Sequence, residues 1–477
     1  MPARVDVLGD LQQEKKTVCD SFNRQRKGRK LRIQQKISNL PAMKFEQLYE
    51  FRQQAYECLG KAKDATFELA DAVMTTRHVS CLGDLALNPL FRREWSSAYE
   101  ALQDCRPDQE KLMQLYIQQM SQVERPLLAI DHTAWLRPHA PTLKERTYEH
   151  QPTALPHGIP VGIGQGYSTI AWIPSTIGSW ALPLRHERIT SWENPITKGA
   201  EQLAQVCEYL QNRPIALFDS EYGCAPLITA TAAIAADKLM RIRSNRCLWS
   251  APLSYSGRGR PRTHGKQFKL NDAQSWWEPE QTLESLEAKL GRIRLRKWDN
   301  LHFRGSPKHP MTLILVERLE AVTGHLKTQP LWLVWVGIQM PSLAEIWQLY
   351  LRRFAIEHWY RLAKQTLHWT VPKLSTPEQC QRWSDLMPLV TWQLWLAKDL
   401  VKETRLPWQK SLSELTPGRV AQSMLPLLLG IGTPTVAPKR RGNSDGWQPG
   451  KARTKRCRYP VVKKGKGRFQ KSTKFVS

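Results

Sequence analysis

Two short apolar runs, each ending in an aspartate, constrain the fold of this chain most strongly. Residues 127–130 precede Asp131, and residues 215–218 precede Asp219. Runs of this length, followed by turn residues, are typical of buried strands. In an open α/β sheet, ligands bind outside the carboxyl ends of such strands. The sequence therefore predicts two neighbouring strands that bring both carboxylates to one point.

Helix-like and strand-like segments are distributed unevenly along the chain. Residues 40–120 show the apolar period of helices and contain few breakers, whereas strand-like runs begin after Pro126. An amphipathic helix opened by Thr197 separates the two aspartate runs, and β-like pieces fill residues 250–325. Strands interleaved with helices favour an α/β fold, here a mixed sheet flanked by helices with a β-rich insertion.

Positive charge is concentrated at the two ends of the chain. The formal net charge is +27, of which residues 24–36 contribute +7 and residues 439–477 contribute +13. Such blocks are often flexible and bind polyphosphate. A solvated tail that only maintains solubility is the alternative. The charge predicts a polyanionic partner, either nucleic acid or an anionic membrane surface.

The apolar segments do not favour a membrane protein. The longest one, residues 424–437, is interrupted by two prolines and is shorter than the roughly 20 residues that a span needs. The N-terminus has no apolar signal core. Nine cysteines are scattered without a C-x-x-C pair, which fits a reducing cytosol. We therefore expect a cytoplasmic protein that binds nucleic acid and no membrane.

A single long helix is predicted over residues 342–367. At about 100° per residue, five polar side chains share a stripe about 80° wide, and most apolar residues lie opposite. The stripe consists of Tyr350, Arg353, Glu357, Arg361 and Lys364. A carboxylate flanked by cations suits a site for metal and phosphate. The alternative is an exposed face that carries an ordinary Arg353–Glu357 pair.

Carboxylates that lie close together repel unless a cation neutralises them. Mg²⁺ suits such a place, because it is a hard ion held by one or two carboxylates and by phosphate oxygens. An aspartate after an apolar run is also a common turn or cap residue. For either Asp131 or Asp219 alone, that interpretation stays open.

The spacing Tyr350-x2-Arg353-x3-Glu357-x6-Lys364 resembles the Tyr-Arg-Glu-Lys signature of bacterial DDE insertion-sequence transposases. The residues that begin at Asp131 (DHTAW) and at Asp219 (DSEYG) also look like the first and second acid motifs of that family. The resemblance runs from about residue 120 to residue 400, and the flanks match only in being basic.

The resemblance implies an RNase H-like core whose catalytic triad, Asp131, Asp219 and Glu357, binds two Mg²⁺ (or Mn²⁺) ions. It implies that Tyr350, Arg353 and Lys364 hold DNA near the cleaved phosphate. The implied function is a DNA transposase that binds the terminal repeats of an insertion sequence, cleaves the DNA and transfers the strand. Its partners would be double-stranded DNA, at the element ends and at the target, and a second copy in a homodimer on DNA. A bacterial, nucleoid-associated protein is expected.

Combined with the charge pattern, the resemblance predicts five regions. These are a helical N-terminal DNA-binding region with a basic arm (1–120), the first part of the RNase H-like core (121–249), the β-rich insertion (250–325), the second part of the core with the Glu-bearing helix (326–402) and a C-terminal region with a basic tail (403–477).

Several further residues are candidates for DNA contact. Arg361 lies in the helix stripe, and Trp298 is a candidate for stacking on a flipped base, although a core or surface tryptophan is the alternative. Arg258 and Arg260 lie in a Gly/Arg-rich stretch that suits the minor groove or non-specific phosphate contact.

Two residues beside the aspartates, His132 and Glu221, are candidates for supporting groups or for local hydrogen bonding. Two other functions remain open for the whole chain. One is an RNase H-like nuclease or resolvase without strand transfer. The other is an inactive, domesticated transposase that acts as a DNA-binding protein.

Overall fold

The structure is a computed structural model, and parts of the chain are not described by it. The described residues are 42–151, 155, 158–174, 178–255, 257, 259–287, 291–319, 330–439, 446, 450–452 and 455–465. The basic stretch 24–36 and Arg258 lie outside the described residues.

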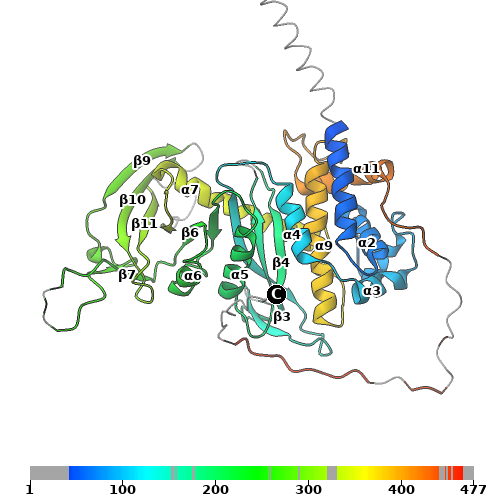
Figure 1. The fold of residues 1–477 in the computed structure, drawn as a ribbon, viewed down its shortest axis with the longest axis horizontal. Coiled ribbons are helices and arrows are strands. Elements are labelled where there is room, and N and C mark those ends of the chain that lie inside the picture. The colour runs from blue at the N-terminus through cyan, green and yellow to red at the C-terminus, as the bar shows by residue number, and fades with distance from the viewer. Residues whose placement is uncertain are drawn as a thin grey trace, which may run out of the picture.

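One mixed sheet of ten strands runs through the described part of the molecule (Figure 1). Its order is β2-β3-β1-β5-β6-β12-β11-β10-β9, and β4 also pairs with β3. The strands are β1 (Leu127–Leu136), β2 (Thr147–His150), β3 (Val161–Trp172), β4 (Leu182–Ile189), β5 (Ile215–Phe218), β6 (Asp237–Arg241), β9 (Gln281–Glu287), β10 (Gly291–Leu301), β11 (Met311–Arg318) and β12 (Leu331–Val336). A small hairpin, β7 (Cys247–Trp249) and β8 (Gln267–Lys269), forms a second sheet.

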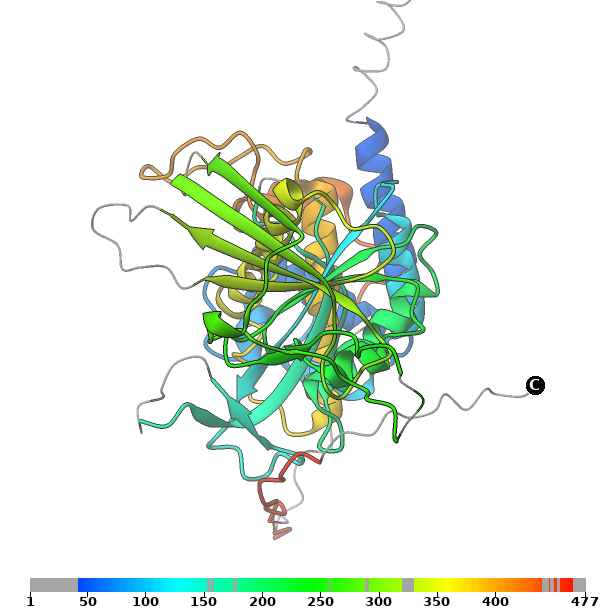
Figure 2. The ribbon, with the colours of Figure 1, turned by 90° about the vertical axis from the view of Figure 1, so that its left-hand side faces the viewer.

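The sheet contains both antiparallel and parallel strand pairs. β1, β3 and β4 form antiparallel pairs, whereas β5 and β6 run parallel to β1. Strands β9, β10 and β11 of the β-rich stretch do not form a separate sheet, because they continue the main sheet through β12. Figure 2 shows how the sheet twists from the teal strands to the yellow-green ones. The arrangement is a mixed α/β fold that is compatible with an RNase H-like core.

Helices flank this sheet. They are α2 (Lys63–Thr75), α3 (Trp95–Asp104), α4 (Gln109–Gln118), α5 (Pro195–Cys207), α6 (Ala225–Ala230), α7 (Leu343–Leu351), α8 (Ala355–Gln365), α9 (Pro377–Ala397), α10 (Pro417–Gln422) and α11 (Met424–Ile431), with 3₁₀ turns η1 (Leu82–Leu87), η2 (Ala273–Ser275) and η3 (Arg352–Phe354). Residues 42–57 are helical as well. No described helix is long and apolar enough to cross a membrane.

Neighbouring residues on β3 show which helices cover which face of the sheet. Ser168 and Thr169 point to opposite faces because side chains alternate along a strand. Ser168 Oγ donates to Gln202 of α5 at 2.8 Å. Thr169 Oγ1 lies 2.8 Å from His186 Nδ1, and the His186 ring packs edge-on against Trp359 of α8. Thus α5 covers one face, and α8 covers the other together with α9, which packs on β4.

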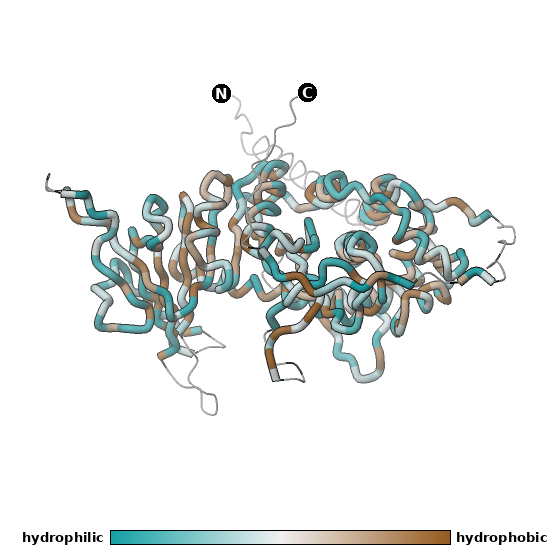
Figure 3. The backbone as a smooth tube through the Cα atoms, turned by 90° about the horizontal axis from the view of Figure 1, so that it is seen from below, coloured by the Kyte–Doolittle hydropathy of each residue, from teal (hydrophilic) through white to brown (hydrophobic). Residues whose placement is uncertain are grey.

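The N-terminal helices are not separated from the sheet. Helices α2 and α3 pack against α9, and their buried apolar side chains belong to the same hydrophobic core as those of the strands. The molecule is elongated, with these helices at one end and β9–β11 at the other (Figure 1). Its apolar stretches lie mainly along the strands and the packed helices (Figure 3).

The single long helix predicted over residues 342–367 is wrong. Helix α7 ends at Leu351, the 3₁₀ turn η3 follows, and α8 starts at Ala355. A 3₁₀ turn contains about three residues rather than 3.6, so it shifts the register between the two helices. Tyr350 and Arg353 are buried, while the Glu357 side chain is 49% exposed.

The basic C-terminal tail is partly described, and residues 455–465 lie along β2. We call these residues the C-terminal strap. Val462 forms a parallel bridge with Thr147, and its N–H donates to the carbonyl of Arg146 at 2.7 Å. Gly465 N–H donates to the carbonyl of Ser191 at 2.7 Å. The strap therefore extends the edge of the sheet.

One ion pair fixes the strap across the sheet. Lys464 Nζ lies 2.8 Å from Glu149 of β2, and the Glu149 side chain is only 5% exposed. A Cβ atom at Gly166 of β3 would lie 2.9 Å from Glu149 Oε2 and 3.0 Å from Lys464 Nζ. Glycine at this position thus leaves the space that the pair occupies.

Candidate active site

The two aspartates lie on adjacent parallel strands. Ile130 of β1 is paired with Phe218 of β5, so Asp131 and Asp219 follow at the same level. Strand β1 continues to Leu136, and Asp131 therefore lies in mid-strand rather than at its end. Its partner across β3 is Thr169, which places Asp131 on the face that α8 covers. The structure thus brings the two carboxylates to one place, as the apolar runs predict.

Helix α8 adds a third carboxylate beside them. Glu357 lies in its first turn, and its side chain is 49% exposed. The guanidinium of Arg353 contacts all three acids. Its nitrogens lie 3.1 Å from Asp131 Oδ2, 2.6 Å from Glu357 Oε1 and 4.0 Å from Asp219 Oδ1. A single guanidinium can reach all three only because the carboxylates surround one small space.

Burial determines the electrostatics of this cluster. It raises the pKa of Asp131, while the Arg353 guanidinium acts in the opposite direction. Burial also disfavours the charged form of Arg353, which is 3% exposed, but Asp131 and the other carboxylates raise its pKa above the usual value. The carboxylates therefore hold Arg353 in its charged form, while Arg353 offsets only part of the effect that burial has on the pKa of Asp131.

His132 and Glu221 support Asp131 from the side. The backbone N–H of His132 donates to Asp131 Oδ1 at 2.8 Å. The His132 ring lies 3.6 Å from Glu221 Oε2 through Nε2 and 3.4 Å from the Tyr222 hydroxyl through Nδ1. These contacts fix the ring beside the cluster.

The other cations of the helix stripe differ in their surroundings. Lys364 Nζ donates to Thr133 Oγ1 at 2.7 Å, and burial lowers the pKa of Lys364. Arg361 is exposed. Tyr350 was expected at the DNA surface, but it is 1% exposed and burial raises its pKa to about 12. Its ring lies in the core beside Arg353, and its contact with DNA stays a prediction.

Trp298 is a core residue of the β-rich stretch rather than a residue that can stack on a base. It is fully buried against Phe268 and Trp332, and its indole N–H donates to the carbonyl of Trp277 at 2.8 Å. It could not reach a base without unfolding of this core. Arg260 is exposed.

A basic group that the sequence interpretation missed follows β6. Arg241 and Arg243 are exposed and Arg246 is half-buried, and none of them forms an ion pair with an acid in the described part of the chain. Because β6 is parallel to β5, these arginines follow the same edge as Asp219. A Cβ atom at Gly223 would lie 2.3 Å from the carbonyl oxygen of Arg241, so this glycine permits the approach. The sequence signal that could have identified this group is a third strand-like segment, residues 238–244, which has arginines near its end.

Phe354 was missed as well. It precedes α8 and is 41% exposed, with the Arg353 guanidinium 5.2 Å from its ring centroid. An exposed aromatic ring beside three carboxylates can stack on a base. No periodicity distinguishes it, because it lies in the 3₁₀ turn.

The donor set fits a hard divalent cation. Three carboxylates supply the oxygen ligands that Mg²⁺ prefers. Within the described residues, no group of three His, Cys, Asp or Glu side chains is already arranged around a metal position. The Arg353 guanidinium lies between the carboxylates instead.

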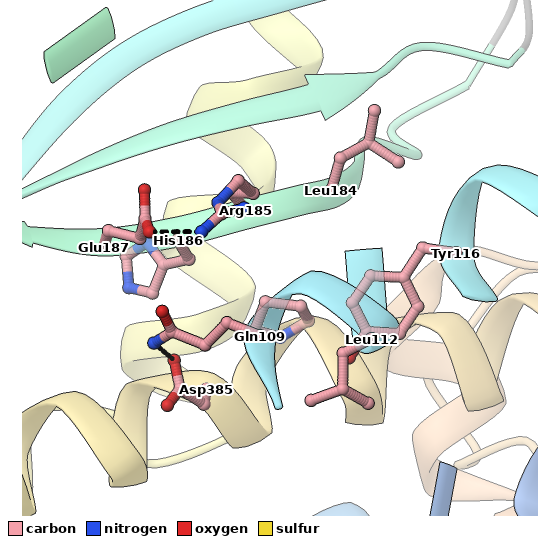
Figure 4. A pocket seen from close by; sticks show the side chains of 9 residues that line it. Gln109, Leu112, Tyr116, Leu184, Arg185, His186, Glu187 and Asp385 are labelled. Atoms are coloured by element: carbon pink, nitrogen blue, oxygen red, sulfur yellow. Dashed lines mark hydrogen bonds and ion pairs between the residues drawn. The ribbon is translucent and has the colours of Figure 1, made fainter. Parts of the chain in front are cut away.

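A small cavity of about 20 Å³ lies away from this cluster, between α4, β4 and α9 (Figure 4). Asp385 of α9 accepts hydrogen bonds there from Gln109 at 2.9 Å and from Gln381 at 2.7 Å. Burial raises the pKa of Asp385 to about 7, although these two hydrogen bonds act in the opposite direction. The cavity has room for about one water molecule and belongs to the packing between helix and sheet.

Comparison with known proteins gives one family. The family model described as DDE superfamily endonuclease matches residues 54–302, just over half of the chain. The matched segment begins in the N-terminal helices and includes Asp131 and Asp219, and it ends before Glu357. No curated protein matches the chain.

Proposed function

The chain belongs to the DDE superfamily of endonucleases, and from this premise we propose that it is a DNA transposase that cuts and rejoins the ends of an insertion sequence. The family implies a nuclease-type enzyme that acts on DNA, and its members generally use divalent metals. The observation that carries the proposal is the convergence of Asp131, Asp219 and Glu357 on one guanidinium.

In the proposed mechanism, Asp131, Asp219 and Glu357 hold two Mg²⁺ (or Mn²⁺) ions. When bound, such a pair activates an attacking water or 3′-hydroxyl and stabilises the leaving oxygen in an in-line displacement. Cutting and joining then use one site, because only the nucleophile differs. His132 keeps Asp131 oriented through the backbone N–H that donates to its Oδ1.

The cations around the cluster are proposed to hold DNA. Lys364 and Arg361 on α8 and the exposed Arg241 and Arg243 after β6 can neutralise phosphates on either side of the carboxylates. The C-terminal strap adds Lys455, Arg456, Arg458 and Lys463, which are exposed. Arg260 is proposed as a more distant contact. A homodimer on DNA is part of the proposal.

A strand-transfer assay tests this function. Duplexes taken from the DNA flanking the coding region, with a free 3′-hydroxyl, are incubated with the full chain, Mg²⁺ and a supercoiled plasmid. Joining of the duplex to the plasmid supports a transposase. Cleavage without joining supports a nuclease or resolvase instead, and binding with neither reaction supports an inactive DNA-binding relative.

A further inference from the structure

The guanidinium of Arg353 occupies the centre of the carboxylate cluster. It is almost fully buried and lies within 4.0 Å of an oxygen from each of the three acids. We propose that Arg353 is the resident counter-cation of this cluster, and that divalent metal enters by displacing its guanidinium. The proposal rests on the proposed function, since it assumes that these carboxylates bind the metal.

The contacts of Asp131 make the competition unavoidable. Its Oδ1 accepts the backbone N–H of His132 at 2.8 Å, and its Oδ2 accepts Arg353 Nη1 at 3.1 Å. Both oxygens therefore have partners already. Mg²⁺ requires oxygens at about 2.0–2.1 Å in nearly octahedral geometry. A divalent cation at that distance from Asp131 Oδ2 would lie beside the positively charged guanidinium, which is 3.1 Å from the same oxygen, and the repulsion between the two cations favours displacement of the guanidinium.

The negative charges of the three carboxylates require a nearby cation when no metal is bound. Three carboxylates in a partly buried space repel one another, and the cost is large where water is excluded. Arg353 offsets this repulsion through contacts with Asp131 and Glu357, the latter at 2.6 Å. The same contacts oppose metal binding, because the metal must replace a favourable interaction rather than enter an open site.

A displaced Arg353 guanidinium can turn towards the surface of the site, because Arg353 lies in the 3₁₀ turn. Its guanidinium lies 5.2 Å from the half-exposed Phe354 ring, at the surface of the site, and Arg353 Nε has no hydrogen-bond partner among the described residues. A guanidinium released towards this surface can bind a DNA phosphate bidentately. Metal loading and phosphate binding then favour each other, since linkage between two binding events is reciprocal.

Mn²⁺ titration of the full chain by calorimetry, together with melting temperatures with and without Mn²⁺, tests this exchange. Arg353→Gln should bind Mn²⁺ about tenfold more tightly than the wild type, within the usual range of coupling between sites. Its metal-free form should melt lower, and saturation with Mn²⁺ should remove most of that difference. Arg353→Lys, whose single ammonium cannot bridge three carboxylates, should also bind Mn²⁺ more tightly and guards against a fold lost in the glutamine variant.

Arg185→Gln is the matched control. Arg185 is another buried arginine between two acids, 3.2 Å from Glu110 and 2.9 Å from Glu187, but it lies outside the cluster. Its removal should lower the melting temperature and leave Mn²⁺ affinity unchanged.

Three outcomes separate the proposals. Tighter Mn²⁺ binding in both Arg353 variants, and not in Arg185→Gln, supports the exchange. If Mn²⁺ binding is lost in Glu357→Gln but neither Arg353 variant binds more tightly than the wild type, the counter-cation role is overturned and the metal site stands. If no Mn²⁺ binding depends on Glu357, both the exchange and the proposed metal triad are overturned.

Discussion

Asp131 depends on its neighbours more than either of the other two acids does. Its side chain is 15% exposed, against 34% for Asp219 and 49% for Glu357. Burial raises its pKa, and Arg353 and the backbone N–H of His132 counteract that rise. At the scale of single residues, the site therefore contains one largely buried acid, Asp131, which a single cation stabilises. The other two acids, Asp219 and Glu357, are more exposed.

Lys364→Ala should weaken binding to cleaved DNA more than it weakens folding. Among the described residues, the Nζ atom donates only to Thr133 Oγ1, so little structure depends on it, while neutralising a phosphate contributes directly to affinity. Filter binding at several salt concentrations measures this, and the salt slope should fall by about 0.9 for each phosphate that the variant no longer neutralises. An unchanged slope would exclude Lys364 from the DNA interface.

Asp385 should make stability depend on pH. Its pKa is about 7 in the folded protein, while an unfolded aspartate titrates near 3.9. Because the folded pKa is raised, the contribution of Asp385 is fully present below about pH 3.9 and is lost as pH rises towards 7, by about 1.4 kcal/mol per pH unit at most. Between pH 5 and pH 7.5, the wild type should lose melting temperature relative to Asp385→Asn. Parallel curves for the two proteins would contradict the assignment.

The sequence predicts the residues of the site better than their exposure. The resemblance to the transposase family predicts Asp131, Asp219 and Glu357 as a triad, whereas the apolar runs and the helical period alone leave turn, cap and surface roles open. The structure brings the three acids to one guanidinium, and their catalytic role stays a prediction. The burial of Tyr350 and Arg353 does not follow, because it depends on tertiary contacts with residues distant in the sequence, such as the contact between Arg353 and Asp131. The burial of Trp298 depends on Phe268 and Trp332, which are distant in the sequence.

At the scale of elements, the C-terminal strap differs most from the structure that its sequence pattern predicts. A run of cations with little apolar content is typical of a flexible arm. The strap is instead held by backbone hydrogen bonds to Pro141, Arg146 and Ser191 and by the Lys464–Glu149 pair in the space above Gly166. Strand pairing is a long-range property, so neither this docking nor the joining of β9–β11 to the main sheet could be derived from periodicity.

Glu149→Gln should release the strap and weaken binding to all DNA sequences alike. The neutral amide cannot compensate the charge of Lys464, so the cations of the strap lose their fixed positions. Glu145→Gln is the control, because Glu145 lies just before the same strand and pairs with Arg188 instead, at 2.6 Å. Protease sensitivity after residue 455 and DNA affinity report the two effects. Equal behaviour of the two variants would mean that the pair does not hold the strap.

At the scale of the whole molecule, the N-terminal helices and the sheet form one core. Arg52, in the helix over residues 42–57, is 1% exposed; it lies 2.8 Å from Asp71 of α2 and also donates to Gln393 of α9. These buried polar contacts join segments that the five predicted regions assign to different parts. The region boundary at residue 120 is therefore a change of sequence pattern rather than a gap in the packing.

A fragment that begins at residue 121 should not fold, because it would expose the side of α9 that packs on α2 and α3. A fragment that begins at residue 42 keeps these contacts and should melt like the full chain. Circular dichroism and size-exclusion chromatography of the two fragments test this. Cooperative unfolding of the shorter one would mean that the helices form an independent domain.

DNA cleavage by the Glu357→Gln variant tests most directly the claim that Asp131, Asp219 and Glu357 form the catalytic site. The amide keeps the size and polarity of the side chain but loses the charge that is proposed to hold the metal. In a gel assay with labelled element ends, with and without Mg²⁺, the variant should bind the ends like the wild type and cut none of them. Glu46→Gln, which changes an exposed acid on the N-terminal helix, should bind and cut normally. Cutting by Glu357→Gln at the wild-type rate would contradict the account.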